Sequence, residues 1–392
     1  MVWSGSHVAT VSIAGDDAHE AAKEAAFELK DRLGCTPDVV VVFFSAEFAA
    51  AEIRNGLWSE LPSTTQVLGC SSFAEIGPDG ALTHSVTALG LVLPGYRASV
   101  LSVAGGSDSY ELGKQLVFPL SGQVPDLLIL LPDVLSLNAT RLLRGIQKVI
   151  GDRTPIVGGA PADMGAFKQT TMIAGSNLQT SGAVALALYG PISISAAAFS
   201  GYTPVSIPLR ATKVEQGNVV LELNGKPALD VYLDFLGPRK SELPAVTIEY
   251  PIGVLSGPAD AKTVTVDVVR AAFRMDENRG AIVLGGDIPE GAELRILSAT
   301  RDDVLRGTKQ AMQSALLSCQ DADLMLLFNC MSRKIILGPR YKEEYVVADS
   351  VLPKEVPRIG FYTYGELSPV AEVTQHHEST FTVAAIRFGK HS

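Results

Sequence analysis

The sequence predicts an α/β protein of two domains, in which repeated strand–helix–strand–strand units form mixed β-sheets with helices packed outside, as in a layered αββα arrangement. Continuous apolar runs such as Val39–Phe44 are typical of strands that are covered on both faces. Segments of helical periodicity separate these runs, and the order of the elements recurs along the chain. A chain of 392 residues, 47% of them hydrophobic, is too long for one ordinary core, so we expect two domains.

The elements expected in the first 95 residues follow from apolar periodicity and from helix-end signals. Asp17 with Glu20 forms a capping pattern, and Gly34 is a typical helix stop. In order, we expect a strand at 8–13, a helix at 17–34, a strand at 39–44, a helix at 46–61, a strand at 66–68 and a strand at 85–93.

A second unit repeats this order between residues 123 and 190. It comprises an apolar strand at 127–131, a helix at 137–150, a short strand at 156–157 and a closing strand at 182–189. The similar spacing predicts an internal duplication, with copies at about 35–95 and 123–190. The first domain is expected to comprise residues 1–205 and to end at the proline-containing stretch 204–210.

The second expected domain comprises residues 206–392. Its first part contains short strands and turns, with a helix started by Pro227. Thr300 and Asp303 predict a capped helix that ends near Cys319. A strand at 323–328, the stretch 360–367 and a strand at 379–388 then form a third round of the same order.

A glycine-led turn that carries an acid recurs in each round. Gly69-Cys-Ser-Ser-Phe-Ala-Glu75 and Gly360-Phe-Tyr-Thr-Tyr-Gly-Glu366 both place Glu six residues after Gly, and a looser copy runs from Gly158 to Asp163. Two interpretations are open. The carboxylate either accepts backbone N–H bonds and pins its own turn, or it lies in a cleft at the ends of strands and receives a cationic group of a ligand.

An arginine and two tyrosines are further candidates for a binding site. Arg333 can clamp a ligand carboxylate through two parallel hydrogen bonds, or it can pair with one of the acids Glu343, Glu344 and Glu366. Tyr362 and Tyr364 either wall an apolar pocket or pack in the core.

Two cysteines follow strands, where nucleophiles often lie. These are Cys70, which is followed by Ser71 and Ser72, and Cys330. A cysteine nucleophile needs a base and a lowered pKa, and neither cysteine has a histidine nearby in the sequence. We therefore expect buried, unreactive thiols.

Composition and motif content argue against several classes of protein. A net charge of −10 argues against nucleic-acid binding. The stretch 169–209 lacks charged residues, but glycines and prolines interrupt it before it reaches the ~20 apolar residues of a membrane span. The spacing of the histidines forms no metal site, and nucleotide-binding motifs are absent, so we expect no metal and no cofactor. The four cysteines lack paired spacing and indicate free thiols in a reducing compartment, the cytoplasm.

These motifs together resemble the signatures of the FIST family, in which an N-terminal and a C-terminal FIST domain lie in tandem. The resemblance rests on Gly69-Cys-Ser-Ser-x-x-Glu75, Cys330-x-x-Arg333 and Gly360-Phe-Tyr-x-Tyr-Gly-Glu366, and it covers about residues 25–385. It implies an intracellular sensory module of bacterial and archaeal signal transduction that binds small ligands, amino acids among them. The chain departs from the family pattern at Ala74, where the family usually has Gly, and a left-handed turn there would be costly for Ala.

On this resemblance we expect a small-ligand sensor that works alone or signals through a separate protein. If the ligand is an amino acid, Arg333 would take its carboxylate and Glu75 or Glu366 its ammonium group, while Tyr362 or Tyr364 would cover its apolar part. The expected lining also includes Cys70, Ser71, Ser72, Asp163 and Cys330.

Two other functions stay open at this point. One is an enzyme of acyl or thiol transfer that uses Cys70 or Cys330. The other is an interaction scaffold without a small-molecule site. Both are less expected than the sensor, and an enzyme is not favoured because no catalytic constellation is evident in the sequence.

Overall fold

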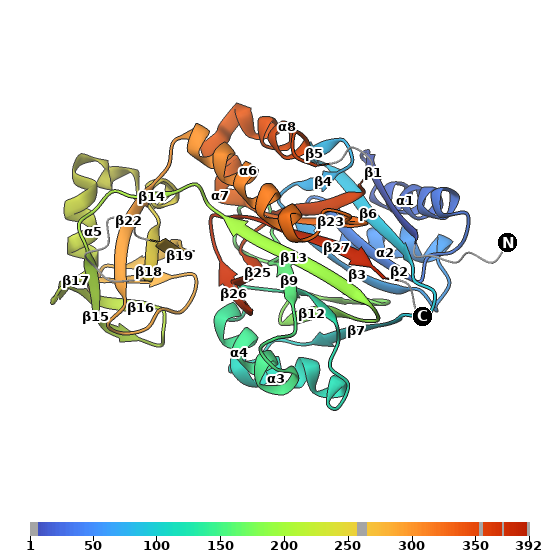
Figure 1. Ribbon diagram of the computed structural model, residues 1–392. Coiled ribbons are helices and arrows are strands. Elements are labelled where there is room, and N and C mark those ends of the chain that lie inside the picture. Colours follow the sequence, from blue (N-terminus) through green and yellow to red (C-terminus); the bar gives the residue numbers. More distant parts are fainter. Residues whose placement is uncertain (1–6, 257–264, 353–355, 371, 390–392) are drawn as a thin grey trace.

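The computed structural model describes residues 7–256, 265–352, 356–370 and 372–389, and it confirms the predicted α/β class (Figure 1). Most of the described chain forms a large body of three mixed sheets with helices outside. Residues 203–298 form a separate small domain, which is mainly antiparallel β-sheet.

The first structural unit of the large body confirms the expected order of elements. It consists of β1 (His7–Ala14), α1 (Ala18–Leu33), β2 (Val39–Ser45), α2 (Ala50–Glu60), β3 (Gln66–Ser72), β4 (Glu75–Gly77), β5 (Gly80–Leu82) and β6 (Ser85–Val92). Helix α1 begins after Asp17, whose side chain accepts the N–H of Glu20 at 3.0 Å, and it ends at Gly34 in the left-handed conformation. Strands β2 and β3 are parallel, and β6 lies antiparallel between β1 and β2.

The same order occurs twice more. The second unit has β7 (Arg97–Val103), α3 (Ser109–Val117), a 3-10 turn η1 (Phe118–Leu120), β8 (Leu127–Pro132), α4 (Ala139–Ile150), β9 (Ile156–Gly159), β10 (Met172–Ala174), β11 (Asn177–Gln179) and β12 (Ala183–Tyr189). The third has β13 (Ile192–Phe199), α6 (Arg301–Ser318), β23 (Leu324–Cys330), α7 (Met331–Leu337), η4 (Gly338–Lys342), α8 (Glu343–Asp349), β24 (Arg358–Thr363), β25 (Glu366–Val370), β26 (Val373–His377) and β27 (Phe381–Phe388). The uncharged stretch 169–209 is thus a series of short strands and turns.

Each unit contributes its short hairpin to the sheet of another unit. Hairpin β4–β5 pairs with β24 of the third unit, β10–β11 pairs with β3 of the first, and β25–β26 pairs with β9 of the second. The three exchanges form a closed ring. The sequence did not predict this exchange, because hairpin spacing does not identify the partner of an edge strand.

The recurring glycine of the turn motif is required by this packing. A Cβ atom on Gly69, Gly158 or Gly360 would lie 2.5, 1.9 and 1.8 Å, respectively, from a carbonyl oxygen of the neighbouring parallel strand. Contacts under 3 Å are not tolerated without a backbone shift. The glycines therefore serve the close approach of paired strands.

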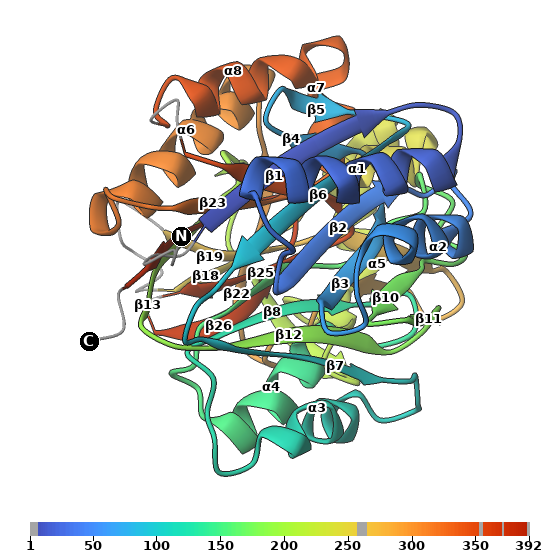
Figure 2. The ribbon, with the colours of Figure 1, turned by 90° about the vertical axis from the view of Figure 1, so that its right-hand side faces the viewer.

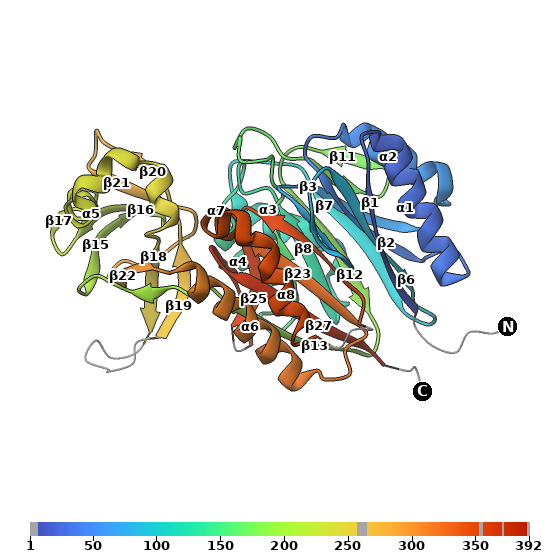
Figure 3. The ribbon, with the colours of Figure 1, turned by 90° about the horizontal axis from the view of Figure 1, so that it is seen from above.

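The inner faces of the three sheets share one core, and the helices cover the outer faces (Figures 2 and 3). Phe43, Ile129, Phe328 and Phe361 from different units meet in this core. Helices α1 and α2 cover the first sheet, α3 and α4 the second, and α6 and α8 the third. Mixed sheets with helices outside are therefore present as predicted, and the three sheets surround one common core.

The small domain is inserted between β13 and α6 of the third unit. It comprises β14 (Thr203–Pro204), β15 (Leu209–Glu215), β16 (Val219–Leu223), β17 (Lys226–Pro227), α5 (Ala228–Leu236), the 3-10 turns η2 (Gly237–Glu242) and η3 (Ala245–Ile248), β18 (Ile252–Ser256), β19 (Thr265–Arg270), β20 (Ala272–Asp276), β21 (Ala281–Leu284) and β22 (Glu293–Ser298). It has its own core around Tyr232 and Ile282. The strand pairing of the large body does not follow the expected division at residue 205, because β13 pairs with β27 and β9 pairs with β25.

Candidate functional site

Glu75 and Glu366 are buried at equivalent places, each on the first residue of an exchanged hairpin. Glu75 accepts hydrogen bonds from the hydroxyl groups of Ser72 and Ser85, the latter at 2.6 Å. Glu366 accepts from Thr363 and from both the hydroxyl and the N–H of Thr380, at 2.8 and 3.2 Å. Neither residue has exposed surface.

Burial governs the protonation of these two acids. It raises the pKa of Glu75 to about 7 and that of Glu366 to about 8, against the opposing effect of the hydrogen bonds. Both side chains connect the start of a hairpin to a neighbouring strand. Of the two interpretations of the acid-bearing turn, the geometry fits the one in which the carboxylate pins the turn, with hydroxyl groups as the main donors.

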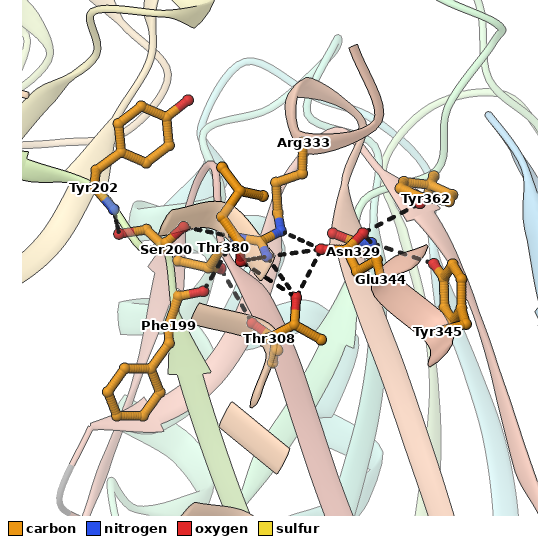
Figure 4. Close-up of polar contacts among 12 residues, drawn as sticks. Phe199, Ser200, Tyr202, Thr308, Asn329, Arg333, Glu344, Tyr345, Tyr362 and Thr380 are labelled. Carbon is orange, nitrogen blue, oxygen red and sulfur yellow. Dashed lines mark hydrogen bonds and ion pairs between the residues drawn. The ribbon is translucent and has the colours of Figure 1, made fainter. Parts of the chain in front are cut away.

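Arg333 is also fully buried, and its guanidinium group contacts only protein acceptors. Nε and Nη2 donate to Glu344 Oε1 at 3.0 and 2.7 Å. Nη1 donates to the carbonyl oxygen of Ser200 at 2.7 Å, and Nη2 contacts the carbonyl oxygen of Val304 and the hydroxyl of Thr308, each at 2.8 Å (Figure 4). This corrects the expectation that Arg333 clamps a ligand carboxylate, because its donors are already used. The alternative reading, an ion pair with Glu344, is the one observed.

Tyr362 belongs to the same buried network. Its hydroxyl donates to Glu344 Oε2 at 3.3 Å, and the amide of Asn329 donates to the same oxygen at 2.6 Å (Figure 4). Tyr362 has no exposed surface and packs edge-on against Tyr345. It is therefore a core residue here, and the expected role as a pocket wall does not apply to it.

The two candidate cysteines are buried and poorly suited to nucleophilic chemistry. Burial raises the pKa of Cys70, and the nearby charge of Glu75 raises it further. Burial and the charge of Glu366 act in the same way on the pKa of Cys330. Since the thiolate is the nucleophilic form, these surroundings disfavour reaction at either thiol.

The two serines beside Cys70 are also engaged within the protein. The hydroxyl of Ser71 accepts the N–H of Thr171 at 3.1 Å, while that of Ser72 contacts the carbonyl oxygen of Phe44 at 3.0 Å as well as Glu75. These serines hold neighbouring strands and turns together.

Asp163 and Tyr364, which are far apart in the sequence, meet in the structure. The Tyr364 hydroxyl donates to Asp163 and accepts the N–H of Gly165 at 2.7 Å. The ring of Phe167 stacks on Tyr364 at 4.4 Å between centroids and meets Phe273 of the small domain edge-on at 5.6 Å. Partial burial acts to raise the pKa of Asp163, but hydrogen bonds from Tyr364 and three backbone amides lower it overall. This pair lies where the large body meets the small domain.

A cleft of about 370 Å³ opens at this junction. The small domain contributes Phe273, Leu284 and Gly285 to its lining. The large body contributes Tyr364, His376 and Glu378. Other lining residues are Ser107, Ser109, Val134, Leu135, Ser136, Leu137, Asn138, Arg141, Gln216, Asn218 and Val283. A concave site between domains is a common setting for small ligands, and polar side chains make up most of the lining of this one.

His376 and Glu378, which the sequence analysis did not select, are the distinctive polar groups of this cleft. Both ring nitrogens of His376 are buried and have no hydrogen-bond partner among the described residues. Burial, with the charges of Arg270 and His377, lowers the pKa of His376 well below its usual value, so the ring is neutral at pH 7. Burial raises the pKa of Glu378 to about 7, against the charge of Arg270 and the N–H of Ala271.

Three glycines allow His376 and Glu378 to lie this close to the backbone. A Cβ atom on Gly285 would lie 1.7 Å from Glu378 Oε1, and one on Gly286 would lie 3.0 Å from His376 Nδ1. A Cβ atom on Gly365 would lie 2.5 Å from His376 Nε2. The signal available in the sequence was the His376-His377 pair and the Gly285-Gly286 pair, but nothing in the spacing links the two.

Contacts across the cleft hold the small domain to the large body. Arg270 of the small domain donates to the carbonyl oxygen of His376 at 2.8 Å. Asp287 accepts the amide of Asn138 at 2.8 Å and contacts Arg141 Nε at 3.4 Å. The two parts are thus joined by polar contacts on the rim and floor of the cleft.

The doubt over Ala74 is resolved by its backbone conformation. Neither Ala74 nor Gly365 has a positive φ, so this position of the turn does not require a left-handed residue. Gly365 is needed for the space that His376 occupies. The Ala at position 74 therefore carries no backbone penalty of the expected kind.

Within the described ranges, no group of three or more His, Cys, Asp or Glu side chains is arranged to hold a metal ion. No helix in that part of the chain is both long enough and apolar enough to cross a bilayer.

Comparison with known proteins places this chain among a set of uncharacterized relatives. A protein of Mycobacterium tuberculosis is 24% identical over 383 residues, which is 95% of this chain and 97% of its own length. A protein of Methanocaldococcus jannaschii is 25% identical over 265 residues, so the match covers 58% of this chain and only about half, 48%, of that relative. A solved structure of chorismatase matches over 98% of this chain and 99% of its own at 9% identity, but its TM-score of 0.34 is too low to support an argument.

Family comparison gives a clearer result. The FIST N domain matches residues 38–226, and the FIST C domain matches residues 228–369. FIST domains are associated with sensory signal transduction. The chain belongs to the FIST family, with both of its domains in tandem.

Proposed function

We infer that this protein is an intracellular small-ligand sensor whose ligand binds in the cleft between the small domain and the large body. The observation that carries this proposal is His376, which lines a 370 Å³ cleft and whose two ring nitrogens have no hydrogen-bond partner among the described residues. An unpaired polar group inside a protein costs roughly 1–3 kcal/mol, and a ligand that bonds to it removes this cost. The four cysteines are free thiols, which supports an intracellular setting.

The ligand that we propose is an amino acid or another small carboxylate. Glu378 provides an acceptor for an ammonium group, and the neutral ring of His376 provides one acceptor and one donor nitrogen. Arg141 at the rim supplies a positive charge, while Tyr364 and Phe273 supply apolar surface. The proposed site keeps Tyr364 from the residues that the sequence predicts, and it has His376 and Glu378, which line the cleft, in place of Arg333, Glu75 and Glu366.

Signalling follows from the position of the cleft. A ligand that contacts both walls binds one arrangement of the two parts better than others, and it shifts the population toward that arrangement. A separate signalling protein would then recognise the favoured arrangement. A ligand that binds all arrangements equally would transmit nothing.

The test is a thermal-shift screen over amino acids and small organic acids, followed by calorimetric titration of any compound that stabilises the protein. His376→Phe removes the ring nitrogens, and Glu378→Gln removes the negative charge. Each should weaken binding by about tenfold or more, as expected for ~1.4 kcal/mol or more.

The control is His84→Phe, which makes the same change at a histidine whose side chain is 41% exposed. It should bind the compound as the unmodified protein does. Binding that changes less than about twofold in both cleft variants, with both folded, contradicts the assignment of the cleft. A screen in which no amino acid or small acid raises the melting temperature contradicts the ligand class.

A further inference from the structure

The small domain is attached to the large body by two chain connections that lie side by side. The incoming connection runs from the end of β13 through Gly201 to β14, and the outgoing one runs from the end of β22 to Thr300, where α6 begins. Immediately beyond them, β14 and β22 pair as antiparallel strands. The attachment is therefore a double-stranded hinge (Figure 1).

Gly201 brings the incoming connection against the first turns of α6. Its φ is +82°, and a Cβ atom there would lie 2.2 Å from the carbonyl oxygen of Asp303. Gly307, one turn further along α6, also faces Gly201, since a Cβ on Gly307 would lie 2.8 Å from the Gly201 nitrogen. The incoming connection can approach α6 this closely only because both positions lack a side chain.

Arg333 bonds the incoming connection to the start of α6. Its Nη1 donates to the carbonyl oxygen of Ser200 on the incoming connection (Figure 4). Its Nη2 donates to the carbonyl oxygen of Val304 in the first turn of α6, the helix that the outgoing connection enters. Glu344 and Thr308 fix the guanidinium group from the other side. All of these side chains are fully buried.

The connection is also fixed on the side of the small domain. Tyr202, the residue after Gly201, is buried, and its hydroxyl donates to the carbonyl oxygen of Ile248 at 2.7 Å. The incoming connection is thus bonded to the large body at Ser200 and to the small domain at Tyr202.

We propose that Arg333 is a hinge clasp, a positioning residue that sets the orientation of the small domain over the cleft by holding the incoming connection against the start of α6. Beyond its ion pair with Glu344, Arg333 uses two of its donors on backbone carbonyl groups, one in the incoming connection and one in the first turn of α6. Its own helix, α7, and the helix of its partner Glu344, α8, are thereby coupled to any rotation of the small domain. The proposal goes beyond the proposed function and does not depend on which ligand the cleft takes.

The test measures the distance between the two parts of the ligand-free protein by pulsed electron spin resonance. Spin labels are placed on exposed positions of α4 and α5 by Lys148→Cys and Asp230→Cys, in a Cys35→Ser background that removes the partly exposed native thiol. Arg333→Lys keeps the charge but removes the geometry that reaches both carbonyl oxygens. Gly201→Ala leaves Arg333 intact, and its added Cβ forces the incoming connection away from α6.

The matched control is Arg358→Lys, because Arg358 is also largely buried and donates to a backbone carbonyl group, that of Pro78, but lies away from the hinge. Both hinge variants should shift the distance distribution or widen it by about twofold, as expected when a hinge is released, while the control should not. If Arg333→Lys fails to fold, Gly201→Ala decides the question. An unchanged distribution in the folded hinge variants overturns the proposal, and so does an equal widening in the control.

Discussion

Replacing Glu366 by glutamine tests whether this buried carboxyl group is protonated in the folded protein. Glu366 has no exposed surface, and its oxygens accept hydrogen bonds from Thr363 and Thr380. Its pKa is raised by burial from an ordinary value of 4.5 to about 8. Glutamine has nearly the same shape but cannot ionise, so it removes the pH dependence that belongs to this site.

The sign of the effect follows from the raised pKa. Below pH 4.5 the group is protonated in both the folded and the unfolded protein, and its full contribution to stability is present. Between pH 4.5 and 8 the unfolded protein releases the proton while the folded protein keeps it, so stability falls as the pH rises. Because the window closes near pH 8, a change from about pH 5.5 to about pH 8.5 crosses about 2.5 units of it, which at about 1.4 kcal/mol per unit corresponds to a loss of roughly 3 kcal/mol.

The assay is urea unfolding of the unmodified protein and of Glu366→Gln at these two pH values. The free-energy difference between the two proteins should move by roughly 3 kcal/mol in favour of the variant as the pH is raised. Effects of titrating groups that do not interact with Glu366 cancel in this difference, whereas Glu378, whose charge raises the pKa of Glu366, contributes a smaller part of the change. Glu372→Gln, at a side chain that is 77% exposed, is the control and should give a difference of about zero at both pH values. A difference for Glu366→Gln that stays constant with pH would refute the reasoning, because it would show that Glu366 is ionised in the folded protein as well as in the unfolded one.

Two further predictions concern the strand contacts and the thiols. Gly360→Ala should lower the free energy of unfolding by at least about 2 kcal/mol in urea titration, because the added Cβ meets a carbonyl oxygen of β23. The control is Gly15→Ala, where the added Cβ has open space, and it should change the free energy of unfolding by less than about 0.5 kcal/mol. Equal effects of the two substitutions would contradict the explanation by close strand contact. Iodoacetamide near neutral pH should label Cys35 first and the three buried thiols only as fast as the protein unfolds, as read by peptide mass spectrometry. Rapid labelling of one equivalent at Cys70 or Cys330 would instead revive the cysteine-dependent enzyme.

Much of the fold could be predicted because the helices and strands of each unit have local sequence signals. Continuous apolar runs identified β2, β8 and β23, and the capping pattern at Asp17 identified the start of α1. The glycine-led turn was found because its cause, contact between adjacent strands, is the same in all three units. Such features depend on neighbours in sequence or on one adjacent strand.

The site was harder to predict because its parts are joined only by tertiary structure. The sequence selected residues whose chemistry suits ligands, yet Arg333, Glu75 and Glu366 find their partners inside the protein. Whether a charged side chain faces a cavity or a buried acceptor depends on elements that are distant in sequence. Tyr364 was predicted as a site residue and does line the cleft. His376 could not be predicted from the sequence, because it is distinctive only through the lack of a hydrogen-bond partner for its ring nitrogens among the described residues.

The exchange of hairpins has a consequence for folding during synthesis on the ribosome. When synthesis has reached β13, the sheet of the first unit already has all its strands, but β9 still waits for β25, and hairpin β4–β5 waits for β24, nearly three hundred residues later in the chain. Exposed strand edges of this kind invite pairing with other chains. The edges of β9 and of hairpin β4–β5 therefore lack their partner strands until the C-terminal segment has been synthesised. In a truncated chain without that segment, both edges would stay unpaired.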